Sequence, residues 1–132
     1  MKIHELLEKY AGHPVDIDYH GGLCPTQVQA TIGDYHLYYR ARHGEFTVCV
    51  ADTFNHAVEA DRADHEGVIY FIEGDDPTEG YVPEETYTET VDKAIEFTLM
   101  KIAMDTMTKD EFTSALDDVT RNIMNDDSPD ID

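Results

Sequence analysis

The chain has little positive charge. It contains nine Lys and Arg residues against 29 Asp and Glu residues, so its formal net charge is −20 when the histidines are neutral. A protein with this charge repels phosphate backbones and anionic lipids. We therefore expect neither direct binding to nucleic acid nor electrostatic docking to a membrane.

Cysteine and long apolar runs are also scarce. Cys24 and Cys49 are too few for a disulfide scaffold and lack the paired spacing of metal ligands, so we interpret both as free thiols, with Cys49 buried. The longest apolar run, residues 68–72, is far shorter than the ~20 residues of a membrane-spanning helix. The first residues turn acidic at once and lack the apolar segment of a signal peptide. The sequence thus predicts a cytoplasmic location, in the host cell if a phage encodes the protein.

The chain does contain enough apolar and aromatic residues for a core. Of its 132 residues, 41% are hydrophobic, and they include eight Tyr and five Phe. This composition separates the chain from the apolar-poor, highly charged sequences of disordered proteins. We expect a single domain over residues 1–124, followed by a flexible acidic tail over residues 125–132.

The middle of the chain alternates apolar and polar residues. Residues 28–32, 35–41 and 46–50 each show the period of two that is typical of half-buried strands, and glycine-containing turns join them. This pattern predicts an antiparallel meander. Residues 15–19 and 68–72 predict further strands, and Val58 with Ala60 indicates a short edge strand between them.

Helical periodicity occupies the two ends of the chain. Residues 2–10 predict a short amphipathic helix, and the apolar stripe from Val91 to Ala103 predicts a long one. Phe97, Met100, Met104 and Met107 broaden that stripe, so we expect the long helix to be buried on more than one side. Residues 112–123 predict a last helix after a capping-box sequence. The fold class is α+β: an N-terminal helix, a four- to five-stranded mainly antiparallel sheet, and two C-terminal helices.

Some residues suggest catalytic or metal chemistry. His56, Asp61, Asp64 and His65 lie close together in the sequence, and imidazole with carboxylate suits zinc or iron. They lack any fixed ligand spacing, so we interpret them as solvated and keep a metal-dependent enzyme as the alternative. Negative charge also disfavours a thiolate at Cys24. We therefore expect no cofactor and no catalytic residue. The same charge should raise the pKa of several of the seven histidines.

One predicted strand is both aromatic and basic. Tyr38, Arg40 and Arg42 share one face of it, which could stack on bases or bind an anionic ligand. The interpretation we favour is that this face closes internal ion pairs with neighbouring acids, since positive charge is so scarce.

The carboxylates are distributed over the chain rather than confined to one run. Successive turns of a helix bring acids 5 to 6 Å apart along its axis, a spacing comparable in scale with the charges of a nucleic-acid backbone, by the ~1.5 Å rise per residue. The acids that we expect to contact a partner lie in the predicted loop at residues 74–85, at the start of the long helix and on the last helix: Asp75, Asp76, Glu79, Glu84, Glu85, Glu89, Asp92, Glu96, Asp110, Asp117 and Asp118.

In size, charge and α+β plan the chain resembles the DNA-mimic proteins of phages and mobile elements, which block restriction or CRISPR enzymes. The resemblance is one of physical character over the whole chain, without a shared motif, and no residue role follows from it. It implies a non-enzymatic inhibitor whose partner is a basic nucleic-acid-binding protein, such as a defence nuclease complex. The alternatives are a protein of other function with a generically acidic surface, and an adaptor whose aromatic strand pairs with a partner.

Overall fold

A computed structural model describes residues 1–106 of the chain. Residues 1–100 form one compact unit of the chain. This unit holds every described element except the last six residues of the final helix, and the description below concerns it. The predicted last helix and the predicted boundary at residue 124 lie outside the described residues.

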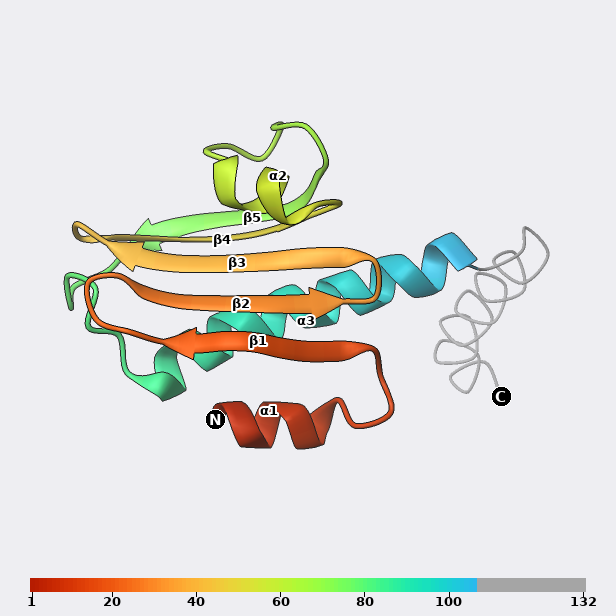
Figure 1. The fold of residues 1–132 in the computed structure, drawn as a ribbon, viewed down its shortest axis with the longest axis horizontal. Coiled ribbons are helices and arrows are strands. Elements are labelled where there is room, and N and C mark those ends of the chain that lie inside the picture. The colour runs from red at the N-terminus through yellow and green to blue at the C-terminus, as the bar shows by residue number, and fades with distance from the viewer. Residues whose placement is uncertain (107–132) are drawn as a thin grey trace, which may run out of the picture. The chain divides into compact units, whose positions relative to one another are not determined.

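Five strands form one sheet in chain order, and each is antiparallel to the next (Figure 1). This confirms the predicted α+β class and the meander. Figure 1 also shows the helices on either side of the sheet. The strands are β1 (Val15–Gly21), β2 (Thr26–Ile32), β3 (Tyr35–Arg42), β4 (Glu45–Ala51) and β5 (Val68–Asp75).

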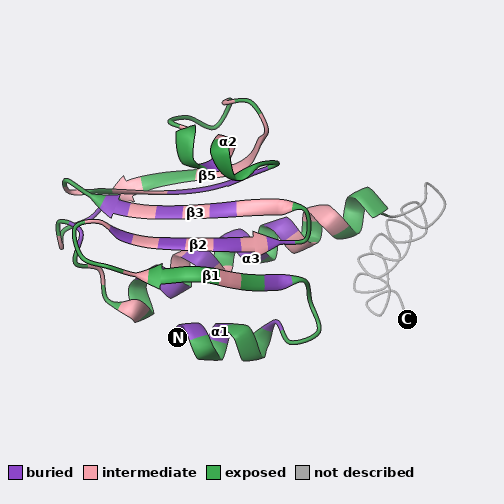
Figure 2. Cartoon of the chain, in the orientation of Figure 1, coloured by how far each residue is buried: buried purple, intermediate pink, exposed green. Residues whose placement is uncertain are grey.

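The alternation along the strands gives the sheet one apolar face and one polar face. Along β2 and β3, buried residues alternate with half-buried ones, as the colours of Figure 2 show. On the apolar face Leu37 pairs with Val50, and Tyr39 pairs with Val48, all four at most 2% exposed. Because neighbouring residues of a strand point to opposite faces, the residues between them form the polar face.

Two helices cover the apolar face. In α3 (Glu84–Thr106), Tyr87 lies 6.2 Å from Tyr39 and Phe97 lies 5.3 Å from Tyr70, both distances between ring centroids. The helix α1 (Ile3–Lys9) runs alongside the first half of α3 in the same direction, since its first residue bonds to Glu84 and its last to Asp92. The core of the unit therefore lies between the sheet and these two helices.

The polar face carries a short helix where we predicted an edge strand at Val58 to Ala60. That prediction is wrong, because α2 (Phe54–Glu59) occupies this segment. Thr53 begins the helix, and its Oγ1 accepts a hydrogen bond of 3.1 Å from the backbone N–H of His56. Ala57 of α2 packs against Cys49 and Ala51 on the sheet, which confirms the burial of Cys49. The helix at residues 54–59 is thus stabilised by packing on the sheet, since the hydrophobic pattern of this segment alone does not distinguish a helix from a strand.

The long helix is buried on one side. Val91, Ala94 and Ile95 are fully buried, as predicted, but Met100 is 64% and Met104 52% exposed. The expectation of burial on more than one side is therefore wrong for the described part, because one sheet face covers one stripe of a helix. Met107 lies outside the described residues. Among residues 1–106 no helix is both long and apolar enough to cross a membrane.

A buried hydroxyl fastens the segment before α3 to the start of β2. Thr26 is fully buried; its Oγ1 donates a hydrogen bond of 2.6 Å to the carbonyl of Gly80 and accepts one of 3.2 Å from the N–H of Val82. The N–H of Cys24 donates to the same carbonyl at 2.8 Å. These bonds hold the connection between β5 and α3 against the turn between β1 and β2.

Replacing Thr26 with Val keeps the shape of the side chain and removes its hydroxyl, leaving the Val82 N–H without its partner. We expect Thr26→Val to lower the free energy of unfolding by about 1–3 kcal/mol, measured by urea denaturation. The matched control is Thr47→Val on β4, whose hydroxyl makes no hydrogen bond within residues 1–106, and we expect little change there. Equal losses in both variants would contradict this role of Thr26.

Candidate functional site

The register of the last two strand pairs gathers carboxylates at one end of the sheet. Glu45 pairs directly with Asp75, and Thr47 pairs with Glu73. The three acids therefore share the polar face, where Glu45, Glu73, Gly74 and Asp75 line a hollow of about 260 Å³. We refer to them, together with exposed acids of the following loop and helix, as the acidic end: Glu45, Glu73, Asp75, Glu79, Glu85 and Glu89.

The loop and the start of α3 adjoin this group of strand residues. A second hollow, of about 220 Å³, is lined by Asp75 and by Thr86 and Thr90 of α3. Glu85 and Glu89 precede these threonines by one residue, a rotation of about 100° around the helix, so they stand on an adjacent side of α3 and do not line this hollow. All members of the acidic end are exposed, and none forms an ion pair within residues 1–106. Like charges directly opposite on a sheet are destabilising by a few tenths of a kcal/mol up to about 1 kcal/mol. A positively charged partner would relieve that repulsion between Glu45 and Asp75.

Asp76 has to be removed from the predicted partner-binding residues. It is 4% exposed, and its carboxylate accepts hydrogen bonds from the N–H of Thr78 at 2.9 Å, the hydroxyl of Thr78 at 2.5 Å and the N–H of Gly80 at 2.6 Å. Burial by itself would raise the pKa of Asp76, but these hydrogen bonds outweigh it and hold the pKa below its ordinary value. Asp76 thus stabilises the loop through hydrogen bonds to Thr78 and Gly80, and its charge is not available to a partner.

Replacing Asp76 with Asn removes the charge that these donors face. We expect Asp76→Asn to lower the free energy of unfolding by about 1–3 kcal/mol at neutral pH. A lowered pKa in the folded state gives stability that is present above the ordinary value of 3.8 and is lost as the pH falls through the folded value. Urea denaturation over a pH series should therefore show the difference between wild type and variant shrinking in acid. Asp75→Asn, at the exposed neighbouring carboxylate, is the control and should not lower the free energy of unfolding.

Three other predicted partner-binding acids bond to α1. Glu84 Oε2 accepts a 2.9 Å hydrogen bond from the N–H of Ile3, which satisfies a free donor at the start of α1. Lys9 Nζ lies 2.8 Å from Asp92 Oδ2 and 2.8 Å from Glu96 Oε1. The bonds to Asp92 and Glu96 raise the pKa of Lys9. These carboxylates therefore join the two helices, and their charge is partly balanced within the chain.

Tyr10 adds to this junction from the end of α1. Its hydroxyl donates a hydrogen bond to Asp92 Oδ1, and burial together with that bond raises the pKa of Tyr10. The predicted contacts Asp110, Asp117 and Asp118 lie outside the described residues. Of the predicted set, Asp75, Glu79, Glu85 and Glu89 thus remain exposed and without an ion pair in residues 1–106.

The histidine and aspartate cluster does not assemble as a metal site. His56 Nδ1 lies 2.6 Å from Asp52 Oδ1, and Asp64 pairs with Arg62 at 3.0 Å. The rings of His56 and His65 are 5.9 Å apart, edge to face. In the part of the chain that the structure describes, no group of three or more His, Cys, Asp or Glu side chains could hold a metal ion. Residues 1–106 thus do not bring His56, Asp61, Asp64 and His65 together as a set of metal ligands.

His56 instead links α2 to the residue that follows β4, Asp52, through a hydrogen bond. The hydrogen bond to Asp52 raises the pKa of His56 and lowers that of Asp52, so the expectation of raised histidine pKa values holds at this residue. Gly67 makes room for the pair, since its φ is +77° and a Cβ there would overlap Asp52 Oδ1. Only glycine adopts this φ without strain, so the contact depends on Gly67.

Removing the Asp52 charge should lower the pKa of His56. We expect Asp52→Asn to bring it down toward the ordinary value of 6.5, measured by NMR titration of the imidazole protons. A raised pKa in the folded state gives stability that is complete below 6.5 and is lost as the pH rises through the folded value. Asp61→Asn, at a neighbouring exposed carboxylate, is the control. An unchanged His56 titration in Asp52→Asn would show that the pair does not form.

Tyr38, Arg40 and Arg42 lie on the polar face as predicted, but not in the predicted ion pairs. The ring of Tyr38 packs edge to face against Phe54 of α2 at 6.2 Å. Arg40 and Arg42 line a hollow of about 260 Å³ with His43, Glu45, Phe46 and Thr47. Neither arginine forms an ion pair with any residue of the described range 1–106. Within that range the interpretation that this face closes internal ion pairs is therefore wrong.

Cys24 and His20, four residues apart in the sequence, have separate hydrogen-bond partners. His20 Nδ1 bonds instead to the hydroxyl of Tyr87 at 2.7 Å, on the apolar side of the sheet. Cys24 lies exposed in the turn before Pro25, with its N–H bonded to Gly80.

No sequence pattern indicated that Glu45 and Glu73 belong among the contact residues. Their place beside Asp75 comes from the pairing of β4 with β5, and a period of two identifies strands without fixing which residues face each other. The short turn at His43 and Gly44, both with positive φ, was the signal that would have aligned β3 with β4.

Comparison of this chain with family models, curated proteins and solved structures finds no match in any of the three.

Proposed function

We propose that this protein is a non-enzymatic inhibitor that binds the basic nucleic-acid-binding surface of a partner and blocks it, in the cytoplasm of the cell where it acts. The partner is a defence nuclease or another DNA- or RNA-binding protein. The observation that supports the proposal is the acidic end: exposed carboxylates on paired strands and on a helix, none of which forms an ion pair in residues 1–106.

The spacing of these carboxylates suits a groove that holds phosphates. Residues two apart on a strand, such as Glu73 and Asp75, lie about 7 Å apart, and residues four apart on a helix, such as Glu85 and Glu89, lie about 6 Å apart. One strand of duplex DNA carries a phosphate about every 3.4 Å along the axis. The acidic end therefore presents roughly one charge for every two phosphates of a strand.

The rigidity of the support favours binding as well. Glu45 stands on β4, whose other face is buried at Val48 and Val50, and Glu73 and Asp75 stand on β5, which pairs with β4. The loop that carries Glu79 is held by hydrogen bonds of Asp76 and Thr26. Charges that are already fixed in place lose little conformational entropy when a partner binds. Binding of this kind releases the partner's counterions and weakens as salt rises.

The proposal predicts that neutralising the acidic end weakens capture of nucleic-acid-binding proteins. The immobilised protein is exposed to a cell lysate at low salt and eluted with duplex DNA, and the eluted proteins are identified by mass spectrometry. We expect the combined variant Glu45→Gln, Glu73→Gln, Asp75→Asn and Glu79→Gln to lower the association rate with a captured protein by roughly tenfold.

The matched control removes the same number of exposed charges elsewhere, through Glu8→Gln, Asp16→Asn, Glu59→Gln and Asp61→Asn. It has the same net charge as the first variant and should keep most of the association rate. Failure of the wild type to retain any nucleic-acid-binding protein at low salt would sink the proposal. Equal losses in both variants would show that total charge, and not the acidic end, attracts the partner.

A further inference from the structure

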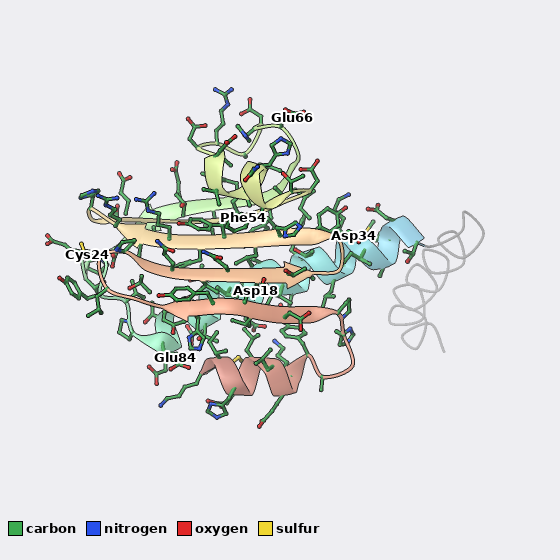
Figure 3. All side chains as sticks on the ribbon, in the orientation of Figure 1. Asp18, Cys24, Asp34, Phe54, Glu66 and Glu84 are labelled. Atoms are coloured by element: carbon green, nitrogen blue, oxygen red, sulfur yellow. The ribbon has the colours of Figure 1, made fainter. Side chains whose placement is uncertain are left out.

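The polar face of the sheet carries its positive charge in one place. Arg40 and Arg42 are alternate residues of β3, so both side chains rise from the same face. Across β4, Thr47 pairs with Arg40 and Glu45 pairs with Arg42. The hollow of about 260 Å³ between them, which we call the cationic hollow, is lined by both arginines, His43, Glu45, Phe46 and Thr47. The polar face of the sheet, which carries this hollow, faces the viewer in Figure 3, where Asp18 of β1 and Phe54 of α2 are labelled.

Both arginines lack the partners that a chain so rich in acids could supply. Glu45 stands directly opposite Arg42 in the register, yet no ion pair joins them, and Arg40 has none in the described range. The Nε of Arg40 is buried and has no hydrogen-bond partner within residues 1–106. Buried donors are almost always paired with protein or water, so the Nε of Arg40 is an exception within residues 1–106.

The lining has the chemistry of an oxyanion site. A guanidinium group presents several N–H donors in a planar fork that matches the oxygens of a phosphate or a carboxylate. Two such groups on one face can approach the same anion, and the hydroxyl of Thr47, which makes no hydrogen bond within residues 1–106, can donate to a further oxygen. The hollow has ample room for one such group, because a water molecule occupies about 30 Å³ in the liquid.

We propose that the cationic hollow binds a single oxyanion group, a phosphate or a carboxylate, of a small ligand, held by Arg40, Arg42 and Thr47. The cationic hollow shares Glu45 with the acidic end, but this proposal does not rest on the function proposed for the acidic end.

The surrounding charge limits the ligand to one compact anionic group. Glu45 lines the cationic hollow and also the neighbouring acidic hollow with Glu73 and Asp75. An anion that extends from the arginines across β4 meets these carboxylates at short range, where salt does not screen the repulsion. The remaining negative charges of the chain lie farther away and are screened over about 8 Å at physiological ionic strength. A polyphosphate chain should therefore bind no more tightly than phosphate does.

The site predicts a saturable response to simple anions. Inorganic phosphate and acetate are titrated separately into the ¹⁵N-labelled full chain at constant ionic strength, and the NMR amide shifts of residues 40–47 are followed. We expect saturation with phosphate, with acetate or with both, and the tighter probe identifies the source of the oxyanion. Arg42→Gln, at an exposed position, should weaken binding about tenfold or more, as should Arg40→Gln.

The control is Arg62→Gln, which removes an arginine that already pairs with Asp64 and should leave the affinity unchanged. Absence of saturation with both probes would overturn the proposal, and so would unchanged affinity in Arg42→Gln. Thr47→Val should weaken phosphate binding by a smaller factor. Tripolyphosphate that binds more tightly than phosphate would show that the ligand is a longer polyanion, against the single-group assignment.

Discussion

The antiparallel register of β3, β4 and β5 is the constraint on which the other features depend. It places Leu37 beside Val50 under the helices, and by the same pairing it places Arg42, Glu45 and Asp75 in one row on the opposite face. A shift of one residue would exchange the two faces, burying the charges and exposing the core. The hydrophobic core thus fixes the positions of the charged groups, although none of them takes part in it.

The few positive charges are used in two different ways. Lys9 lies where α1 contacts α3, and its charge balances part of the negative charge of Asp92 and Glu96. Arg40 and Arg42 stay unpaired on the sheet in residues 1–106, beside carboxylates that are also unpaired. The polar face therefore changes sign over the width of one strand, from the arginines of β3 to the acids of β5. Since strands lie about 4.8 Å apart, the two signs come within about 10 Å of each other across that face.

Local signals in the sequence were enough to predict the meander, but they could not show which acidic residues are exposed at the candidate site. The period of two and the glycine turns predicted β2, β3 and β4, because these patterns record burial of one face within a few residues. Asp76 and Asp75 look alike in the sequence, yet one is buried under three hydrogen bonds and the other is exposed. That difference arises from the loop closing against Thr26, a contact between distant segments. The α2 segment was mistaken for a strand for the same kind of reason, since its packing on Cys49 is tertiary.

The position of β5 at the end of the sheet has a consequence for how copies of this chain behave together. Its first half is apolar, and within the described residues no strand pairs with its outer edge. An open apolar edge invites a second copy to add its own strand, which leads to aggregation. Glu73 and Asp75 occupy the other half of the same strand, so antiparallel pairing of two copies would bring several carboxylates onto one seam. The charges that we assign to partner binding would therefore also oppose pairing of two copies along this edge.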